Sequence, residues 1–556
     1  MNRKQGRKGA EGCAIVYMKL TSKGGIRELK LMKDDIQADV VIIGGGLGGV
    51  ASALSAARMG LRVVMTEETD WIGGQLTSQA VPPDEHKEIE TMGCTRTYRE
   101  IRERVRAYYR GNYPLTEQAA NNPLLNPGRG WVSRLCHEPK VALRVLHDML
   151  APFTSSGRIT ILYDTIPVEA ETEGDIVRSV TVSHVRTQQL TRLTGSYFLD
   201  ATECGDLLPL AGVEHVIGAE SRAETGELHA SEQANPLDIQ SFTHVFAIEY
   251  FPEGNFTIEK PEQYDFWRQY VPAPSVYPLL SMYTINVNDQ TKYRKFNLFS
   301  DGQDPMPLWT YRRIIDKALF EPGFYESDIT LVNWPQNDYY LGPIIGVSEA
   351  EKRQHLENAK QLSFSLLYWL QTEIPRPDGG KGYPGLRLRT DVLGTEDGMA
   401  KAPYIRESRR IKARYTITEA DVGKEMRGEA GIRRYPDTIG VGSYHLDLHT
   451  TTVSHRKFYL PSYPYEIPLG ALLPVRMTNI LPVCKNIGTT QVSNGSYRLH
   501  PTEWNIGESA GYLVAYSLQR QVTPHQVYEE ASHLECFQSF IQEKGVQIHW
   551  PDGFEM

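Results

Sequence analysis

Hydrophobic and polar positions near residue 40 follow first the pattern of a strand and then that of a helix. Val40 to Ile43 form a short, continuous β-branched run, which is typical of a strand buried on both faces. The Ala-rich segment from Val50 to Met59 predicts a helix that ends at Gly60, and Leu61 to Thr66 predict a second apolar strand. This order of strand, helix and strand predicts an α/β fold.

Three glycines stand between the first predicted strand and the helix, with the spacing G-x-G-x-x-G. Gly44, Gly46 and Gly49 permit a tight turn, close approach of the backbone to a pyrophosphate and close packing of helix on strand. The helix that follows directs its positive N-terminal end at the phosphates. Glu67 comes 18 residues after Gly49, where a carboxylate accepts hydrogen bonds from ribose hydroxyls. The sequence therefore predicts a dinucleotide-binding unit.

A second match to the same glycine spacing lacks this context. Gly380, Gly382 and Gly385 have no β-branched strand before them, and no helical pattern follows. Pro384 interrupts the match, and the residues around it favour a turn. We predict a loop there and no nucleotide site.

Later segments alternate between helical and strand spacing. Amphipathic spacing predicts helices, and short β-rich runs between turn residues predict a β-meander. These elements are helices at 96–110, 139–150 and 349–371, a β-meander from 159 to 198, strands at 242–250, 456–460 and 479–484, and a helix that begins near Trp504.

Composition and charge narrow the choice of partner and compartment. The chain has 556 residues, 40% of them hydrophobic and 23% charged, which is typical of a globular protein with more than one domain. Its net charge of −9 argues against nucleic-acid binding, and no apolar run is long enough to span a bilayer. The six cysteines contain no C-x-x-C pair, which favours reduced thiols in the cytoplasm. We expect a small-molecule substrate, with neither a nucleic-acid nor a membrane partner.

Together with the glycine fingerprint, several motifs resemble the two-dinucleotide-binding-domain flavoproteins. They are the Gly-Gly turn within 70–75, the D-A-T-E-C-G-D segment at 200–206 and the closing segment of the chain. More narrowly, 405–410, 495–498 and 507–511 are similar to FAD-dependent oxidoreductases related to fumarate-reductase and heterodisulfide-reductase-type flavoproteins. This resemblance covers most of the chain and implies FAD as the cofactor.

The resemblance also implies which residues bind FAD. The first glycines and the segment 200–206 would enclose the pyrophosphate, with Glu67 at the adenosine ribose. The turn at Gly73 would approach the ribityl chain or the isoalloxazine, and the helix at Gly507 would direct its positive end at the flavin O2 edge. Cys484-Lys485 departs from the family pattern, which usually has Gly-Arg there. The implied FAD-binding residues are Gly44, Gly46, Gly49, Glu67, Gly73, Gly74, Gln75, Asp200, Thr202, Asp206 and Gly507.

A domain organisation follows from the same resemblance. We expect an α/β fold in which a Rossmann-like FAD-binding domain with a β-meander carries an inserted α+β substrate or cap domain. The FAD-binding domain would comprise 36–236 and 471–535, with the cap at 237–470 between them and a C-terminal extension at 536–556. Residues 1–35 are basic and without sustained periodicity, so we expect a disordered tail or a mis-started segment.

The segment 442–449 offers the best candidates for catalysis. If it is extended, His445, Asp447 and His449 share one face. They offer an acid/base group or a metal cluster, and we favour acid/base chemistry or a substrate contact, because three such ligands without a further partner are a weak metal signal. Arg498 and His500 are expected to line the same cavity. The predicted catalytic residues are therefore His445, His449, Arg498 and His500, without a metal.

Two other groups of residues suit a substrate site. Arg406, Arg409 and Arg410 either form ion pairs with nearby acids or bind an anionic substrate group or the flavin, since arginine forks suit carboxylates. The polar and aromatic residues from Trp334 to Tyr340 suit a polar substrate such as a sugar or another hydroxylated metabolite.

The leading functional hypothesis is an FAD-dependent oxidoreductase that transfers a hydride between a small polar organic substrate and flavin N5. His445 or His449 would take or give the accompanying proton. One alternative is an FAD-dependent monooxygenase that needs an external reductant, and another is a non-catalytic flavin-binding protein. The lack of a second credible dinucleotide fingerprint and of C-x-x-C counts against a pyridine-nucleotide disulfide reductase.

Overall fold

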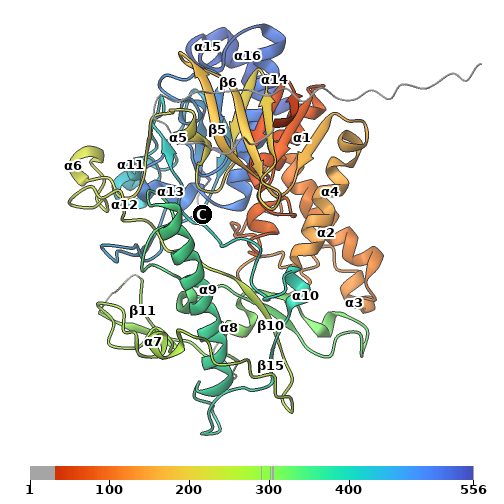
Figure 1. Ribbon diagram of the computed structural model, residues 1–556, viewed down its shortest axis with the longest axis vertical. Helices are drawn as coiled ribbons and strands as arrows, with labels where there is room; N and C mark the ends of the chain where they lie inside the picture. The colour runs from red at the N-terminus through yellow and green to blue at the C-terminus, as the bar shows by residue number, and fades with distance from the viewer. Residues whose placement is uncertain (1–31, 288, 290, 301, 303–305, 555–556) are drawn as a thin grey trace, which may run out of the picture.

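The computed structural model describes residues 32–287, 289, 291–300, 302 and 306–554. Most of the expected N-terminal tail lies outside these described residues. Elements from the beginning and the end of the chain, red and blue in Figure 1, share one half of the molecule, and the green elements from the middle form the other half. The domain boundaries at 237 and 471 stay predictions.

A parallel sheet forms the centre of the first half. In the described part of the chain it has five strands in the order β21–β8–β2–β3–β4. β2, β3 and β8 are buried at every position, as their continuous apolar runs predict. The parallel pairing confirms the predicted α/β fold. The strands are β2 (Val40–Ile43), β3 (Val63–Thr66), β4 (Ile159–Leu162), β8 (Tyr197–Asp200) and β21 (Ile480–Pro482).

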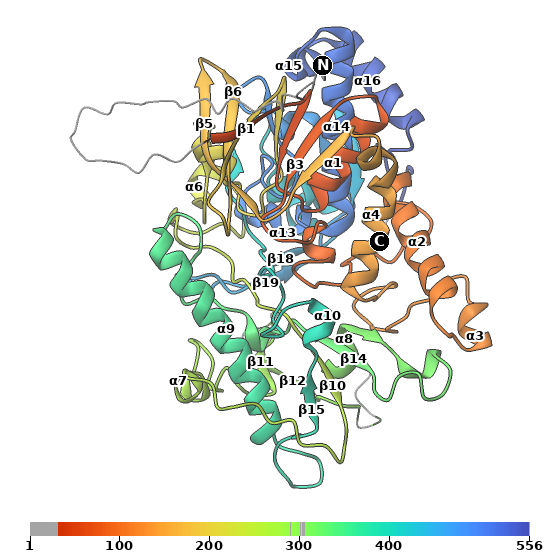
Figure 2. The same ribbon diagram turned by 45° about the vertical axis from the view of Figure 1, so that its right-hand side comes forward.

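Two helices from opposite ends of the sequence, α1 (Leu47–Arg58) and α14 (His500–Arg520), lie side by side against this sheet (Figures 1 and 2). Glycine permits their close approach, because a Cβ at Gly507 would lie 2.2 Å from the Gly48 carbonyl oxygen. The Ser52 hydroxyl donates to the Gly507 carbonyl at 2.9 Å. Helix α14 begins at His500 rather than near Trp504, because Pro501 fits its first turn.

The predicted β-meander is shorter than its sequence pattern indicated. Its antiparallel strands are β5 (Thr165–Glu173), β6 (Ile176–His184) and β7 (Leu190–Thr194), and β1 (Met32–Gln37) pairs parallel with β7. The first and last runs of the predicted range are β4 and β8, which belong to the parallel sheet. The β8 run is apolar and buried throughout instead of alternating, and such a run suits a sheet covered on both faces.

The second half of the molecule is the predicted cap region. It contains an antiparallel sheet in the order β13–β14–β10–β15 and one long helix, α9 (Glu349–Thr372), which begins with a capping box between Ser348 and Glu351. A separate hydrophobic core joins helix and sheet, with Phe246, Val332 and Leu366 among its buried members. The strands are β10 (Phe246–Tyr250), β13 (Arg313–Ile315), β14 (Ile329–Val332) and β15 (Leu386–Leu388).

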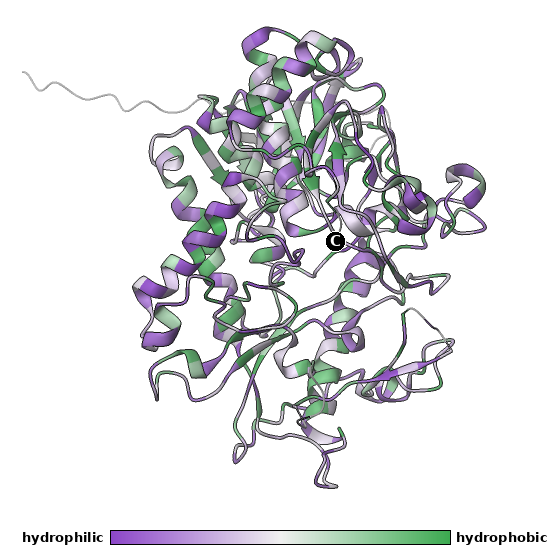
Figure 3. Ribbon diagram, turned by 180° about the vertical axis from the view of Figure 1, so that it is seen from behind, coloured by the Kyte–Doolittle hydropathy of each residue, from purple (hydrophilic) through white to green (hydrophobic). Residues whose placement is uncertain are grey.

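Several further predictions about the elements are confirmed. The second glycine match lies in the loop between α9 and β15. Two amphipathic helices, α2 (Arg96–Asn112) and α4 (Pro139–Ser155), lie beside each other in Figure 2, and purple and green alternate along the outer helices in Figure 3. Of the helices in the described residues, none has the length and apolar character needed to cross a membrane.

After the cap, the chain returns through short strands toward the first half. β17 pairs with β20, and β18 pairs with β19, both antiparallel. These and the closing elements are β16 (Arg410–Ile411), β17 (Thr438–Gly442), β18 (Leu446–Leu448), β19 (Phe458–Leu460), β20 (Tyr465–Pro468), α13 (Gln491–Tyr497), α15 (Pro524–Glu529) and α16 (Ala531–Glu543).

Candidate functional site

A groove of about 530 Å³ opens where β2, β3 and β8 end. Its lining includes Gly44, Gly46, Glu67, Thr202 and Asp206, which the sequence predicts as cofactor-binding residues. In open parallel sheets, ligands bind outside the carboxyl ends of the strands, and this groove has that position.

The fingerprint glycines have different tasks in this groove. Gly44 has a φ of +102°, and a Cβ there would lie 2.3 Å from the Ala201 carbonyl oxygen. A Cβ at Gly49 would lie 2.2 Å from the Gly44 carbonyl oxygen, so both residues are needed for packing. Gly46 caps α1 without a side-chain hydrogen bond, which leaves the first N–H groups of this helix for an anion.

Glu67 is buried at the end of β3. Its Oε1 accepts hydrogen bonds from the Thr69 amide at 2.9 Å and the Thr69 hydroxyl at 2.7 Å. Burial, reinforced by the neighbouring Glu68, raises the pKa of Glu67 to about 8. The protonated carboxyl can both donate to and accept from a ribose hydroxyl.

The predicted residues of the segment 200–206 have two roles: one supports the turn, and the others line the groove. Asp200 is fully buried, and its Oδ1 accepts from the Thr202 amide at 3.0 Å and the Thr202 hydroxyl at 2.7 Å. It therefore holds the turn in place, whereas Thr202 and Asp206 line the groove. Asp206 also pairs with Arg409 at 2.8 Å.

The predicted Gly-Gly turn connects the groove to a second cavity. Gly73 and Gly74 have positive φ angles, and Gly74 lines the groove. Gln75 is fully buried, and its Nε2 donates to the Arg498 carbonyl at 2.9 Å. Arg498 in turn lines the second cavity, so Gln75 lies between the two spaces.

Gly507 differs from its predicted role at a helix end. Because α14 begins at His500, Gly507 lies within the helix and packs against Gly48. The positive helix end is therefore at His500, and the sequence pattern did not reveal this because the polar start of the helix resembles a loop.

A buried ion cluster occupies the place where the chain departs from the family pattern. Lys485 is fully buried and pairs with Glu203, and with Glu503 at 3.2 Å. The Glu203 carboxylate lies over both glycine turns, 2.8 Å and 2.7 Å from where a Cβ would stand on Gly46 and Gly74. Lys485 thus supplies a cation where the family pattern usually has an arginine. No local pattern indicated the partners of Lys485, since Glu203 and Lys485 are 282 residues apart.

The cap contributes side chains to the groove as well. Glu349 and Lys352, at the start of α9, line it together with Arg409. Lys352 lies within the electrostatic influence of Glu68 and Asp206. The sequence predicted α9 only as a cap helix, because its distance from the groove cannot be read from periodicity.

The second cavity, of about 790 Å³, is bounded by residues of both halves. His445, Asp447 and His449 all line it. Asp447 is in the strand β18 and the two histidines flank it, and the alternation along this extended segment places all three at the same cavity, as predicted. Arg498 lines the same cavity from the end of α13, as does Trp334 of the cap.

His449 lies in a chain of charged groups across this cavity. Its Nδ1 is 2.7 Å from Asp338, and its Nε2 is 3.4 Å from Asp447. Asp338 also pairs with Arg406 at 2.9 Å, and Asp447 pairs with Arg498 at 3.0 Å. Although burial opposes ionisation, Arg406 and His449 hold the pKa of Asp338 well below its usual range. His449 and Arg498 likewise lower the pKa of Asp447, to about 2, so both carboxylates are charged at neutral pH.

The other two predicted histidines differ in their surroundings. The His445 ring is 4.3 Å from the Tyr459 ring, and enclosure by protein lowers the pKa of His445. His500 is fully buried behind the cavity wall, where its Nδ1 accepts from the Asp84 amide at 3.1 Å and its Nε2 lies 3.3 Å from the Val81 carbonyl. The structure therefore brings His445 and His449 together with Arg498, but not His500.

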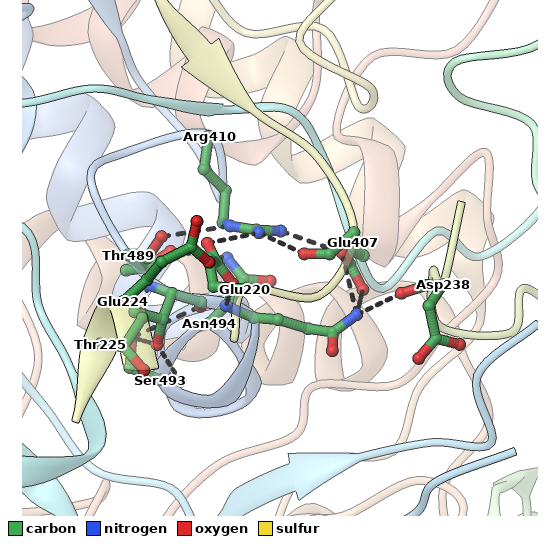
Figure 4. A network of polar contacts seen from close by, with 12 residues as sticks. Glu220, Glu224, Thr225, Asp238, Glu407, Arg410, Thr489, Ser493 and Asn494 are labelled. Carbon is green, nitrogen blue, oxygen red and sulfur yellow. Dashed lines mark hydrogen bonds and ion pairs between the residues drawn. The ribbon is translucent and has the colours of Figure 1, made fainter. Parts of the chain in front are cut away.

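All three arginines of the 405–410 segment form ion pairs. Arg410 is fully buried and bonds to Glu407 at 2.9 Å and Glu220 at 2.8 Å, in the network of Figure 4. Arg406 and Arg409 also have carboxylate partners, yet Arg406 lines the cavity and Arg409 lines the groove. Each of the three arginines therefore forms an ion pair, which was the first of the two interpretations of this segment. Arg410, which lines neither the groove nor the cavity, is a structural residue.

Buried polar atoms between groove and cavity lack hydrogen-bond partners among the described residues. They include Gln75 Oε1, Gln79 Nε2, Asn333 Nδ2, Arg406 Nε and Ser408 Oγ. Buried polar groups rarely stay unpaired, so a bound ring system with a polar edge would satisfy them. Together with the phosphate-facing glycines, they fit a dinucleotide that carries such a ring.

Comparison with known families gives one match over most of the chain. The sequence model described as "FAD dependent oxidoreductase" matches residues 39–540. Among curated proteins no significant match is found.

Solved structures that resemble the chain are distant flavoproteins and related enzymes. The quinol fumarate reductase FrdA of E. coli is 9% identical, covering 92% of this chain and 74% of its own, with a TM-score of 0.34. OxyS anhydrotetracycline hydroxylase from Streptomyces rimosus is 11% identical, with a TM-score of 0.32. The alignment covers 92% of this chain and 68% of the hydroxylase. L-proline dehydrogenase from P. horikoshii is 14% identical, with a TM-score of 0.18. The alignment covers 34% of this chain and 24% of the dehydrogenase. At these scores the likeness carries no argument about the reaction.

Proposed function

Because this chain belongs to the FAD dependent oxidoreductase family, we propose that it transfers a hydride between a small polar organic substrate and FAD. The observation that carries the proposal is the position of His449, which lines the second cavity and is oriented by Asp338. Gln75 and Arg498 connect this cavity to the nucleotide groove.

The groove residues would hold FAD along its length. The open N-terminus of α1 at Gly46 suits the pyrophosphate, and Glu67 suits the adenosine ribose. Gly74 and Gln75 then lie on the path toward the second cavity. When bound, FAD supplies the hydride chemistry at its N5 atom.

His449 is the proposed proton acceptor for substrate oxidation. The Asp338 carboxylate accepts from Nδ1 and fixes the ring, so that Nε2 is the atom available for proton transfer. A substrate hydroxyl within hydrogen-bond reach of Nε2 would pass its proton there as the neighbouring C–H bond breaks. Asp447, 3.4 Å from Nε2, would stabilise the protonated ring. Arg498 keeps Asp447 in place through its 3.0 Å ion pair.

Cofactor content and anaerobic reduction test this proposal. We expect the purified protein to release FAD on denaturation and its bound flavin to bleach when hydroxylated organic compounds are added without oxygen. Bleaching by NAD(P)H or a reductase alone would support a monooxygenase. A flavin that no donor reduces would support a non-catalytic flavin-binding protein, and either result would overturn the proposal.

A further inference from the structure

The second cavity is positively charged in an acidic protein. Among the described residues, seven lysine and arginine side chains and three carboxylates line it. The whole chain has a net charge of −9, so the excess of cations is a property of this cavity and not of the protein. Such a local field raises the concentration of anions at the site.

Most of the cavity's buried cations already have carboxylate partners. Arg406 pairs with Asp338 at 2.9 Å, and Arg498 pairs with Asp447 at 3.0 Å. These two arginines are therefore neutralised by the protein itself and have little charge left for a ligand.

Arg312 has the longest ion pair of the three arginines. Its side chain is 7% exposed, and its ion-pair partner is Asp84, with 3.5 Å between Nη1 and Oδ1. Within the described part of the chain, Nε and Nη1 have no hydrogen-bond partner, and Nη2 has only the Tyr311 hydroxyl at 3.4 Å. A buried guanidinium with so few hydrogen bonds is costly, unless a ligand supplies the missing acceptors.

Aromatic rings hold this guanidinium in a fixed orientation. It lies over the Tyr311 ring at 4.8 Å, and Tyr311 itself stacks on Trp131 with ring centroids 4.3 Å apart. A guanidinium held flat in this way is a prepared fork for a planar anion, because little side-chain freedom is lost on binding.

We propose that the substrate is a small organic carboxylate and that Arg312 binds its carboxylate group. Asp84 offsets part of the Arg312 charge, which favours a singly charged carboxylate over a doubly charged phosphate. This inference rests on the proposed function for the use of the cavity as the substrate site. It deepens that function by naming the charge of the substrate and the residue that binds it.

Ligand binding to the holoenzyme tests the charge requirement without any turnover. Lactate and lactamide have nearly the same shape and differ in charge, so both would be titrated at constant ionic strength, alongside inorganic phosphate. The readouts are thermal stability and the absorbance of the bound flavin. We expect saturable binding of lactate. The affinities for lactamide and phosphate should be lower than the affinity for lactate by roughly tenfold or more. Equal binding of lactate and lactamide, or tighter binding of phosphate, would overturn the inference.

Two substitutions at Arg312 and one matched control locate the site. Arg312→Met should weaken lactate binding roughly 10- to 100-fold, and Arg312→Lys should weaken it less, because lysine keeps the charge without the fork. Arg294→Met is the control, since Arg294 lines the same cavity but is exposed and stacks on Phe296 at 4.5 Å. Its lactate affinity should stay within about twofold of the unsubstituted protein.

The pattern of losses decides between a specific site and a general field. An equal loss in the Arg294 and Arg312 variants would contradict a carboxylate site at Arg312, as would lactate affinity that both Arg312 variants retain. If Arg312→Met fails to fold, the Arg312→Lys variant and the ratio of lactate to lactamide affinity decide the matter. FAD content is measured first, so that loss of the cofactor, which concerns the proposed function, is distinguished from loss of carboxylate binding.

Discussion

His449 Nδ1 lies 2.7 Å from the Asp338 carboxylate, and this contact joins the chain after β18 to the cap. The two residues are 111 positions apart in the sequence. Asp338 is itself held by Arg406 at 2.9 Å, so the ring of His449 has a fixed orientation toward the cavity. The proposed proton transfer depends on this orientation.

Replacing His449 by Asn should therefore slow flavin reduction by the substrate. We expect unchanged FAD content and a rate lower by roughly 10²- to 10⁴-fold, the usual contribution of a positioned acid or base. Asp338→Asn should give a smaller loss, because the ring remains but is less well oriented. Rapid-reaction kinetics under anaerobic conditions measure both.

His445→Asn is the matched control for the histidine substitution. His445 lines the same cavity, but its ring packs on Tyr459 and has no carboxylate at hydrogen-bond distance among the described residues. A reduction rate that falls as far in His445→Asn as in His449→Asn would contradict the assignment, and so would an unchanged rate in His449→Asn.

Gly46→Val should abolish FAD binding while the protein still folds. The nearest atom to a Cβ at Gly46 would be the movable Glu203 carboxylate, at 2.8 Å, with the Ala201 carbonyl oxygen at an ordinary contact distance of 3.6 Å, whereas a Cβ at Gly48 would lie 1.7 Å from the Val483 carbonyl oxygen. The valine would thus occupy the phosphate position without breaking the backbone packing. Flavin absorbance after purification measures the loss. Gly111→Ala, where a Cβ would meet nothing within 4 Å, should keep its FAD.

Lys352→Met should weaken FAD binding and reduce the effect of salt on it. Lys352 reaches the groove from the cap helix α9, where a cation attracts the pyrophosphate. We expect roughly three- to tenfold weaker binding by titration of the apoprotein, as for one partly exposed charge pair. Lys360→Met is the control, because Lys360 lies on the same helix but pairs with Asp397 at 2.7 Å. Equal losses in both variants would point to damage to α9.

The contribution of Glu67 to the stability of the apoprotein should fall as pH rises from about 4.5 to about 8. Burial raises the pKa of Glu67 from 4.5 to about 8, so the folded state binds more protons than the unfolded state between these values. The contribution of protonated Glu67 to the stability of the folded state is therefore complete below pH 4.5 and is lost as pH approaches 8. Glu68, whose pKa burial raises to about 7, adds to the same slope.

Thermal unfolding against pH measures this linkage. Glu67→Gln should make the slope between pH 4.5 and pH 8 less negative than in the unsubstituted protein, because the amide does not titrate. Glu117→Gln, at an exposed position, should leave the slope as it is. A pH dependence that Glu67→Gln leaves unchanged would contradict a raised pKa of Glu67 in the folded state.

The sequence allowed the nucleotide-binding half to be predicted in detail because its signals are local. The strand at Val40–Ile43, the glycines after it and Glu67 lie within about thirty residues, and each follows from the backbone geometry of one β–α–β unit. The face formed by His445, Asp447 and His449 was also predictable, since alternation along a strand is a local rule.

The contacts that complete the two cavities were not predictable in this way. Lys352 approaches the groove and Asp338 approaches His449 only after the cap has packed against the sheet, and no periodicity records that contact. Arg312 is the first of two adjacent arginines and lies directly before β13, and only its burial and missing partners distinguish it. The start of α14 was misplaced because Pro501 and its polar neighbours read as a loop, although proline suits a first helical turn.

Anaerobic reduction of the bound flavin by a donor with deuterium at the oxidised carbon is the most direct test of hydride transfer from the substrate to FAD. Hydride transfer from the substrate breaks that C–H bond, so the account predicts that the flavin bleaches without NAD(P)H and that deuterium slows the bleaching. Flavin reduction that occurs only with NAD(P)H, or a single-turnover reduction rate at saturating donor that deuterium leaves unchanged, would contradict hydride transfer from the substrate.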